Sequence, residues 1–539
     1  MHVVATKSAV ILVVGCALML AIALLAVSPT AMFIASGLLL VLSAAYAMTA
    51  PVGGRLRQER LEFAWWVAHS DPNRAAPRIV PETAFVLRCY IRWRGRNPLR
   101  LSSLYPVMPN GIDLVERDDR DLVLPAEMRS EFDLRLIAAA PGRFVLQGLS
   151  IAVPGALGLF YVPVYFPNPL ALKVLPRASI RLARIPQPIT GQHTDRCGLR
   201  LPRRHGDGVE LREIREFVPG DPFKVIAWMA SARAGKLMVR EVEQEVQAMS
   251  TIIIDVSGSM RAGRLGRRKL DLAIEIAASR ASRALEAGDR VGLITEDGRI
   301  LSHVAPAEGP QQLLRIYDAL LASTEVVDAD LTEEDDRQLV TKVGRYLWQQ
   351  EGVDFSSTEG FRKHDMAAYV DKLMRADGDA SLDFPVNDPD GTSTQLRRFC
   401  KSRGIPLQYR AFTPGEVKAS GLARALSQAG GGTRMPQSIT VITDFDGILD
   451  FDKLIKTLNM LRRRGQTISV IFPDAISLAE EPQSELDRDL YRVYGMRERR
   501  RAEQTRSVLG PLGVPLLVSR RRGAAVDFES GRGSFRQTP

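Results

Sequence analysis

The amino-terminal part of the chain is apolar and uncharged over a long stretch. Positions 8–54 contain no charged residue, and two apolar runs, at about 9–27 and 31–48, are separated by a Ser-Pro-Thr break. A helix that crosses the hydrocarbon core of a bilayer needs about 20 mostly apolar residues. The pattern therefore predicts a two-helix membrane anchor within residues 1–60, and a buried hairpin of a soluble protein is the alternative.

The charges that flank this hairpin indicate its orientation. Lys7 precedes the first run, Arg55, Arg57 and Arg60 follow the second, and the turn between the runs carries no charge. Basic residues favour the cytoplasmic side of a membrane. A signal peptide has a shorter apolar region, of about 7–15 residues, that ends in a cleavage site. We therefore expect both ends of the hairpin, and the rest of the chain, to face the cytoplasm.

The next region, at about 61–180, has the pattern of a β-rich domain. Short apolar runs of strand-like composition are separated by turns rich in proline and glycine, and helical periodicity is poor. The runs lie at about 84–93, 131–137, 142–153 and 170–174. Spacing of this kind is typical of a small β-sandwich or barrel. An irregular linker close to the membrane is the alternative.

The period of the pattern changes after position 250. A β-branched run at 251–256 is followed by a helical pattern that extends to about 285, and apolar runs then alternate with helical patterns. The later runs lie at 290–295, 438–443 and 467–472, and the later helical patterns at 311–321 and 451–464. This alternation predicts a doubly wound parallel sheet over residues 251–539. A ligand of such a sheet binds at the carboxyl ends of the strands.

One segment interrupts this alternation, at about 324–412. It opens with an acidic run and contains two predicted helices, at about 333–350 and 362–375. The segment is too long for an ordinary connection. We interpret it as an insertion above the sheet, either an element that binds a partner or a flap.

Composition narrows the classes of function. The chain has 539 residues, with 72 Lys and Arg against 62 Asp and Glu, so its net charge of +10 suits an anionic partner such as a membrane surface. The four cysteines are scattered, which argues against a disulfide framework or a structural zinc site. No phosphate-binding loop, HExxH motif or nucleic-acid-binding module is present. We therefore expect neither an enzyme nor a nucleic-acid-binding protein.

Oxygen ligands gather where the predicted strands end. Asp255, Ser257 and Ser259 follow the first buried strand, and Asp444 follows the strand at 438–443. Magnesium and manganese prefer oxygen donors of this kind. The sequence therefore predicts a site for Mg²⁺ or Mn²⁺ at this edge, in which hydroxyl ligands leave the ion able to accept a carboxylate from another molecule.

The same residues resemble a von Willebrand factor A domain with its metal-ion-dependent adhesion site. The likeness rests on Asp255-x-Ser257-x-Ser259, on the strand entry at 288–293 and on Thr443-Asp444. It implies that a hydroxyl from a middle loop completes the site, and Ser420 fits this role better than Thr433. The metal ligands implied are Asp255, Ser257, Ser259, Ser420 and Asp444.

A second resemblance covers nearly the whole chain. Its motifs are Pro-Gly-Arg-Phe at 141–144, Gly-Ala-Leu-Gly-Leu-Phe at 155–160 and Arg-Glu-Phe-Val-Pro-Gly-Asp at 215–221. They are similar to the bacterial family called domain of unknown function 58, although Ala227 and Met229 depart from its pattern. The likeness implies a bacterial inner-membrane protein that acts with a MoxR-type AAA+ ATPase, and with other von Willebrand A proteins, in chaperone-like maturation or envelope assembly.

The segment at 181–250 bridges the predicted domains and mixes Arg, Glu, Asp and Trp. We expect either a hydrogen-bonded network that braces the domains or a surface that docks a partner. Trp228 and Arg233 are the expected anchors of such a surface, because Trp and Arg are enriched at interaction hot spots.

Two alternatives to a metal-dependent binding protein stay open. Residues 442–447 also resemble the first motif of haloacid-dehalogenase phosphatases, in which Asp444 would be the nucleophile and Asp446 the general acid or base. That reading leaves Asp255, Ser257 and Ser259 unused. The other alternative is a metal-free scaffold, in which these oxygens hydrogen-bond one another and cap the following helix.

Overall fold

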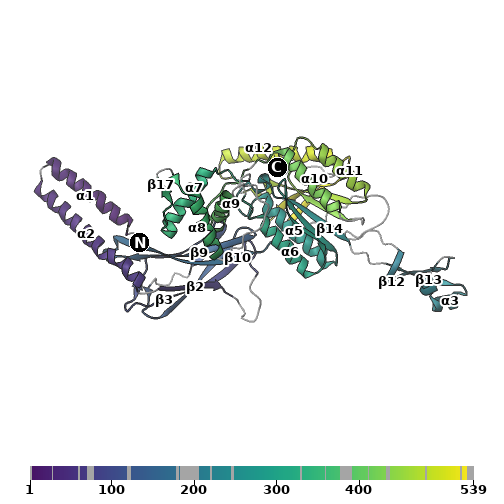
Figure 1. The fold of residues 1–539 in the computed structure, drawn as a ribbon, viewed down its shortest axis with the longest axis horizontal. Helices are drawn as coiled ribbons and strands as arrows, with labels where there is room; N and C mark the ends of the chain where they lie inside the picture. Colours follow the sequence, from purple (N-terminus) through teal and green to yellow (C-terminus); the bar gives the residue numbers. More distant parts are fainter. Residues whose placement is uncertain are drawn as a thin grey trace. The chain divides into compact units, whose positions relative to one another are not determined.

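The computed structural model divides the chain into two compact units. Unit 1 comprises Met1–Pro176 and Glu325–Gln408, and unit 2 comprises Arg177–Thr324 and Tyr409–Pro539 (Figure 1). The structure describes residues 3–26, 28–58, 61–68, 78–117, 123–177, 181–182, 205–218, 221, 223–243, 248–327, 331–357, 360–376, 391–410, 412–431, 437–479, 482–522 and 525–530.

Unit 1 begins with the two apolar helices that the sequence predicts. Helix α1 spans Lys7–Ala26 and helix α2 spans Pro29–Gln58, and the two helices contact each other (Figure 1). Both are long and apolar enough to cross a membrane, with mean hydropathy of 2.8 and 2.0 over their candidate spans. Only 11% and 17% of these spans is buried, whereas the core helix of a soluble protein is mostly buried.

The β-rich part of unit 1 contains two four-stranded antiparallel sheets. One sheet has the order β1-β10-β9-β5 and the other β2-β3-β8-β6. The strands of the first sheet are β1 (Val4–Ala5), β5 (Ser103–Val107), β9 (Gly142–Pro154) and β10 (Phe160–Val174). Those of the second are β2 (Leu61–Val67), β3 (Ala84–Trp93), β6 (Ile112–Arg117) and β8 (Arg129–Ala138). Two short strands, β4 (Leu99–Arg100) and β7 (Val123–Leu124), pair with each other.

Residues of both sheets share one core. Strand β3 alternates exposed and buried positions, so that every second side chain points inward. Ile91 and Trp93 of β3 lie in one cluster with Ile151 of β9 and Val162 of β10. The two sheets therefore pack face to face, which is the arrangement that the turn-punctuated pattern predicts.

The insertion in the α/β sequence belongs to unit 1 and has a core of its own. It contains α7 (Asp336–Tyr346) with a terminal π-turn (Leu347–Glu351), a small hairpin of β17 (Ser356–Ser357) and β18 (Gly360–Phe361), α8 (Lys363–Ala376) and α9 (Thr392–Ser402). The sequence predicted α7 and α8 but not α9. The acidic run has a local role, because Asp335 caps α7 by accepting a hydrogen bond from the backbone N–H of Gln338.

A polar contact joins this insertion to the β-rich part. The hydroxyl of Tyr346 donates to Oε1 of Gln147 in β9 at 2.7 Å, and Nε2 of Gln147 donates to the carbonyl of Arg403. We expected the segment to lie above the α/β sheet. Its contacts assign it to unit 1, which also contains the β-sandwich.

Unit 2 is built on an eight-stranded sheet of order β11-β22-β21-β20-β19-β14-β15-β16. The central strands β21, β20, β19, β14 and β15 are parallel, and β16 and β22 pair antiparallel with their neighbours. The bounds are β11 Arg181–Leu182, β14 Met249–Asp255, β15 Arg290–Glu296, β16 Ile300–Ala307, β19 Ser438–Ile442, β20 Thr467–Pro473, β21 Leu516–Arg522 and β22 Ala525–Ser530. The predicted parallel core is thus confirmed.

Helices cover both faces of this sheet. Consecutive residues of a strand point to opposite faces, and Ile252, Ile253 and Ile254 of β14 are all buried. Strand β14 contacts both α5 and α10. The described helices of unit 2 that follow β14 are α4 (Gly258–Arg261), α5 (Lys269–Glu286), α6 (Pro310–Ser323), α10 (Gly415–Gly431), α11 (Asp452–Arg463) and α12 (Glu485–Leu509), with a 3₁₀ turn at Ala475–Leu478.

The segment before β14 forms a small module. Strands β12 (His205–Glu216) and β13 (Met238–Glu243) pair antiparallel, and α3 (Trp228–Ala234) follows a 3₁₀ turn at Phe223–Val225 between them (Figure 1). Arg215 and Asp221 form an ion pair at 2.6 Å within this module. This ion pair therefore stabilises the β12–β13 module internally.

The core of the insertion yields a stability prediction. Phe399 of α9 is fully buried among α7 and α8. Phe399→Ala should lower the free energy of unfolding by about 3–5 kcal/mol, because a buried aromatic ring leaves a cavity when truncated. Denaturant unfolding measures this, and Trp348→Ala, at an exposed position of the same segment, is the control. Equal stability of the two variants would contradict the assigned core.

Candidate functional site

Two neighbouring parallel strands end in carboxylates at the same edge of the sheet of unit 2. Strand β14 ends at Asp255, and Thr443-Asp444 follows β19 directly. Ile254 is aligned with Ile442 in the β14–β19 register, which brings Thr443 beside Asp255. The Thr443 hydroxyl donates to Oδ2 of Asp255 at 2.7 Å. Both aspartates are fully buried.

A lysine of α10 lies among these groups. Nζ of Lys418 is 2.8 Å from Oδ2 of Asp255 and 2.9 Å from the hydroxyl of Ser259, and it also contacts Oδ1 of Asp444. Lys418 has no exposed side-chain surface. Its ammonium group is therefore the point on which the two aspartates and Ser259 converge.

A second lysine neutralises the other side of Asp444. Nζ of Lys269, at the start of α5, is 3.0 Å from Oδ2 of Asp444 and 3.1 Å from Oε2 of Glu498 in α12. Arg501 continues the network, because it pairs with Glu498 at 2.7 Å and with Asp446 at 2.6 Å. Alternating charges thus run from the edge of the sheet to α12.

The predicted serines lie where the sequence placed them. The backbone N–H of Ser257 donates to Oδ1 of Asp255 at 2.9 Å, and Ser257 directly precedes α4 at the N-cap position. The hydroxyl of Ser259 donates to Oδ1 of Asp444 at 3.1 Å and lies 3.4 Å from that of Ser257. Asp255, Ser257, Ser259 and Asp444 therefore form one cluster.

Ser420 does not join this cluster. Its hydroxyl accepts a hydrogen bond from the exposed Lys453 at 3.2 Å. The middle-loop hydroxyl near the site belongs instead to Thr413, whose Oγ1 accepts from the backbone N–H of Gly258 at 3.2 Å. Thr413-Pro414 directly precedes α10, and proline at a helix start is the sequence signal for this position. The weaker candidate, Thr433, lies outside the described residues.

The backbone around the site is tightly packed. A Cβ atom at Gly258 would lie 1.9 Å from the carbonyl oxygen of Arg410, so only glycine fits there. Phe445 follows Asp444 with a φ of 51°, a conformation that is uncommon for a residue with a side chain. Phe445 is buried in the core, whose packing compensates this strain.

Arg261 stabilises the loop around α4 through buried hydrogen bonds. It is almost completely buried, and it donates to the carbonyls of Val256 and Ser323 at 2.7 and 2.5 Å. Its guanidinium also lies 5.2 Å from the centre of the Tyr409 ring. Burial lowers the pKa of Arg261. These contacts fix the loop that presents Ser257 and Ser259.

The lysines set the protonation of the site. Burial alone would lower the pKa of Lys418, but the charges of Asp255 and Asp444 outweigh burial and raise it. Burial alone would raise the pKa of Asp444, yet Lys418 and Lys269 hold it well below its usual range. Burial, and then the charge of Asp255, raises the pKa of the neighbouring Glu296 far above its usual range. The lysines thus favour the ionised form of Asp444, whereas burial favours the neutral form of Glu296.

These donors do not fit a divalent metal ion. The Lys418 ammonium takes the same oxygens of Asp255, Ser259 and Asp444 that a metal would need, and two cations cannot share them without strong repulsion. Across the part of the chain that the structure describes, no group of three or more His, Cys, Asp or Glu is placed to hold a metal.

Sequence reasoning missed Lys418, although the pattern contains a signal for it. The buried face of α10 includes Lys418, Leu422, Ala425 and Ala429, so the lysine lies on the apolar stripe of the helix. A lysine on such a stripe needs a buried counter-charge. The aspartates at the ends of β14 and β19 are the counter-charges.

The predicted partner-binding residues lie in the β12–β13 module. Trp228 begins α3 and is 65% exposed, and Arg233 lies exposed in the last turn of the same helix. Phe223 and Met229 of this module are also exposed. Side chains of this type rarely gather on a surface that contacts only water.

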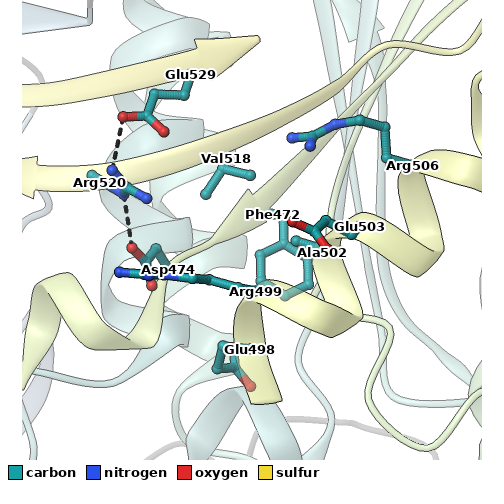
Figure 2. A pocket seen from close by; sticks show the side chains of 10 residues that line it. All are labelled: Phe472, Asp474, Glu498, Arg499, Ala502, Glu503, Arg506, Val518, Arg520 and Glu529. Carbon is teal, nitrogen blue, oxygen red and sulfur yellow. Dashed lines mark hydrogen bonds and ion pairs between the residues drawn. The ribbon is translucent and has the colours of Figure 1, made fainter. Parts of the chain in front are cut away.

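A small hollow that is open to solvent lies between α12 and the sheet (Figure 2). Figure 2 shows Arg520 between two carboxylates, and its distances are 3.0 Å to Asp474 and 2.7 Å to Glu529. Glu498 and Glu503 also line the hollow. Its four carboxylates outnumber its three arginines.

Comparisons with known proteins give a partial match. The model of the family "Protein of unknown function DUF58" matches residues 213–344. Uncharacterised proteins of Mycobacterium bovis and Mycobacterium tuberculosis are 29% identical over 119 residues, which is 22% of this chain. The match spans 36% of the length of each relative. The residues that the family model matches include β13, β14 and the Asp255 loop.

Solved structures add no further support. The cupredoxin domain of amoB from Nitrosocaldus yellowstonii is 14% identical, with a TM-score of 0.14 over 22% of this chain and 84% of that chain. A GH20 exo-β-N-acetylglucosaminidase from Vibrio harveyi is 8% identical, with a TM-score of 0.12 over 76% and 81% of the two chains. Scores this low carry no argument about fold or function.

The buried charges yield a prediction for Lys418→Met. Two buried aspartates lose a shared cation, so the free energy of unfolding at pH 7 should fall by about 3–5 kcal/mol. The pKa of Asp444 rises in the variant, so the folded state takes up a proton at higher pH than before. The deficit should therefore shrink as the pH falls from about 8 to about 5.

Denaturant unfolding at several pH values measures this effect. Lys453→Met removes an exposed lysine of the same unit and is the matched control, with an expected change below about 1 kcal/mol. A deficit for Lys418→Met that equals the control, or that grows on acidification, would contradict the assigned ion pairs.

Proposed function

We propose that this chain is a non-enzymatic, membrane-anchored binding protein. Its α/β unit would engage a partner at the carboxyl edge of the sheet, in a site where Lys418 takes the place of a metal ion. The family resemblance to von Willebrand A domains supports the kind of unit, and the position of Asp255-x-Ser257-x-Ser259 at the end of β14 agrees with it. The partner would dock through apolar contacts instead of a metal-bound carboxylate.

The apolar rim of this edge is the observation on which the proposal depends. Leu449 is 97% exposed and Phe412 is 69% exposed, and Val417 is also exposed. A Cβ atom at Gly415 would lie 1.8 Å from the carbonyl oxygen of Gly447, so the loops that carry these residues are adjacent. Exposed apolar groups around a neutralised polar centre are typical of an interaction surface.

The two apolar helices support a membrane anchor. Their exposed surface is apolar, and Lys7 at the start of α1 is exposed. Strand β1 before α1 and strand β2 after α2 both belong to the β-rich part, so the hairpin returns to the unit from which it leaves. With the basic flanks, this supports the proposal that the soluble part faces the cytoplasm at the bacterial inner membrane.

The partner that we propose is a MoxR-type AAA+ ATPase, and possible further partners are other von Willebrand A proteins. This part of the proposal rests on the resemblance to the DUF58 family, which implies chaperone-like maturation or envelope assembly. The exposed Trp228 and Arg233 offer a second contact for the same partner.

The geometry does not favour the phosphatase alternative. A nucleophilic aspartate must reach its substrate. Asp444 is fully buried and its oxygens are engaged by Lys418, Lys269 and Ser259. Asp446, the candidate acid or base, pairs with Arg501.

Binding of the purified full-length protein to a purified MoxR-type ATPase tests the proposal. Leu449→Ser should weaken binding about tenfold, because loss of a central apolar contact at an interface costs more than about 1 kcal/mol. Leu490→Ser, at an exposed position of α12, should bind like the wild type. Chelation of divalent ions in the absence of nucleotide should leave binding unchanged.

Three results would overturn parts of this account. No binding by the wild type would remove the ATPase as partner. Equal binding by Leu449→Ser and the wild type would remove the apolar rim as the contact. Loss of binding on chelation would restore a metal-dependent site.

A further inference from the structure

The turn between β9 and β10 packs against the base of the apolar hairpin. It consists of Gly155, a 3₁₀ turn at Ala156–Gly158 and Leu159. A Cβ atom at Gly155 would lie 1.9 Å from Oγ1 of Thr49 in α2, so the turn touches the helix with no room to spare. Phe160, the first residue of β10, packs edge to face on Tyr46 at 5.7 Å.

The first helix meets the same turn from the other side. The backbone N–H and the hydroxyl of Thr6 both donate to the carbonyl of Leu159 at 2.9 Å. Leu159 forms a cluster with the buried Ala9 of α1 and Ala45 of α2. The turn is therefore held at a fixed level along both helices.

The turn contacts α1 and α2 at residues that lie within the candidate membrane spans. The spans are Lys7–Leu25 and Pro29–Val52. Tyr46 and Thr49 precede the end of the second span by about 9 Å and about 5 Å, at a rise of 1.5 Å per residue. A helix of 24 residues is about 36 Å long, which exceeds the hydrocarbon core of about 30 Å, so these residues lie at the boundary between headgroups and acyl chains.

Leu157 projects from the turn at this level. It is 72% exposed and has a φ of 64°. The left-handed conformation costs a residue with a side chain about 1–2 kcal/mol, and glycine would avoid that cost. An apolar side chain that is both strained and exposed to water would be doubly unfavourable. Burial of its methyl groups in acyl chains would offset both costs.

We propose that the turn at 155–159 is a third membrane contact, in which Leu157 inserts into the cytoplasmic leaflet beside α1 and α2. The inference rests on the proposed membrane anchor and adds to it an element of the β-sandwich. The contact would fix the sandwich against the bilayer instead of leaving it tethered only by the helix ends. The exposed Lys7, next to Thr6, supplies a cation for anionic headgroups at the same level.

Depth-dependent quenching in the full-length protein tests this contact. Leu157→Cys is labelled with an environment-sensitive fluorophore in a Cys197→Ser background, because Cys16, Cys89 and Cys400 are buried. The protein is reconstituted into vesicles of phosphatidylethanolamine and phosphatidylglycerol with spin-labelled lipids. We expect a blue shift of the emission and quenching by lipids labelled close to the headgroup. The unsubstituted Cys197→Ser protein measures background labelling.

Two further positions separate the possible outcomes. Leu24→Cys lies in the exposed surface of α1, and Leu449→Cys lies in unit 2. Quenching at Leu24→Cys and Leu157→Cys but not at Leu449→Cys would support the contact. Quenching at Leu24→Cys alone would overturn it while the anchor stands. Absence of quenching at Leu24→Cys would overturn the anchor and, with it, the contact.

Discussion

The α/β unit depends on one buried interaction, the pairing of the Lys418 ammonium with Asp255 and Asp444. Carboxylates at the ends of adjacent parallel strands repel each other in a medium of low dielectric constant, so such a pair needs a cation between them. In many proteins a bound ion has this role. Here a side chain of α10 supplies the charge, so ion pairs hold the helix to the edge of the sheet without dependence on an ion from solution.

A lysine in place of a metal ion changes the chemistry that is available at the carboxyl edge of the sheet. A metal ion can exchange water for a partner's carboxylate, whereas a fully buried ammonium engaged by three oxygens has no free direction. In the function proposed here, recognition would fall to the groups around the centre, of which Leu449, Phe412 and Val417 are exposed. The same pairing argues against Asp444 as a nucleophile, because its two oxygens are held by Lys418 and Lys269.

Much of the fold and part of the candidate site could be predicted from the sequence. The features that could not be predicted depend on contacts between distant parts of the chain. Local periodicity revealed the apolar helices and the strands β14, β15, β19 and β20, and strand topology then placed Asp255 near Asp444. Ser420 was chosen because it was expected to precede a helix that leads to the Asp444 strand, yet it lies within α10 and its hydroxyl contacts Lys453. Lys418 was missed because its counter-charges lie 26 or more positions away in the sequence. A single lysine on the apolar stripe of a helix indicates a buried ion pair only when those distant aspartates are considered together with it. The partition of the insertion into unit 1 depends on contacts such as Tyr346 with Gln147, which are separated by 199 positions.

Calorimetric titration of the purified protein with Mg²⁺ and Mn²⁺ tests the central claim most directly. Because Lys418 takes the oxygens of Asp255, Ser259 and Asp444, we predict no saturable binding by the wild type and the same result for Asp255→Ala. Saturable binding by the wild type that is lost in Asp255→Ala would contradict the account, since it would show that a metal ion displaces the lysine from the site.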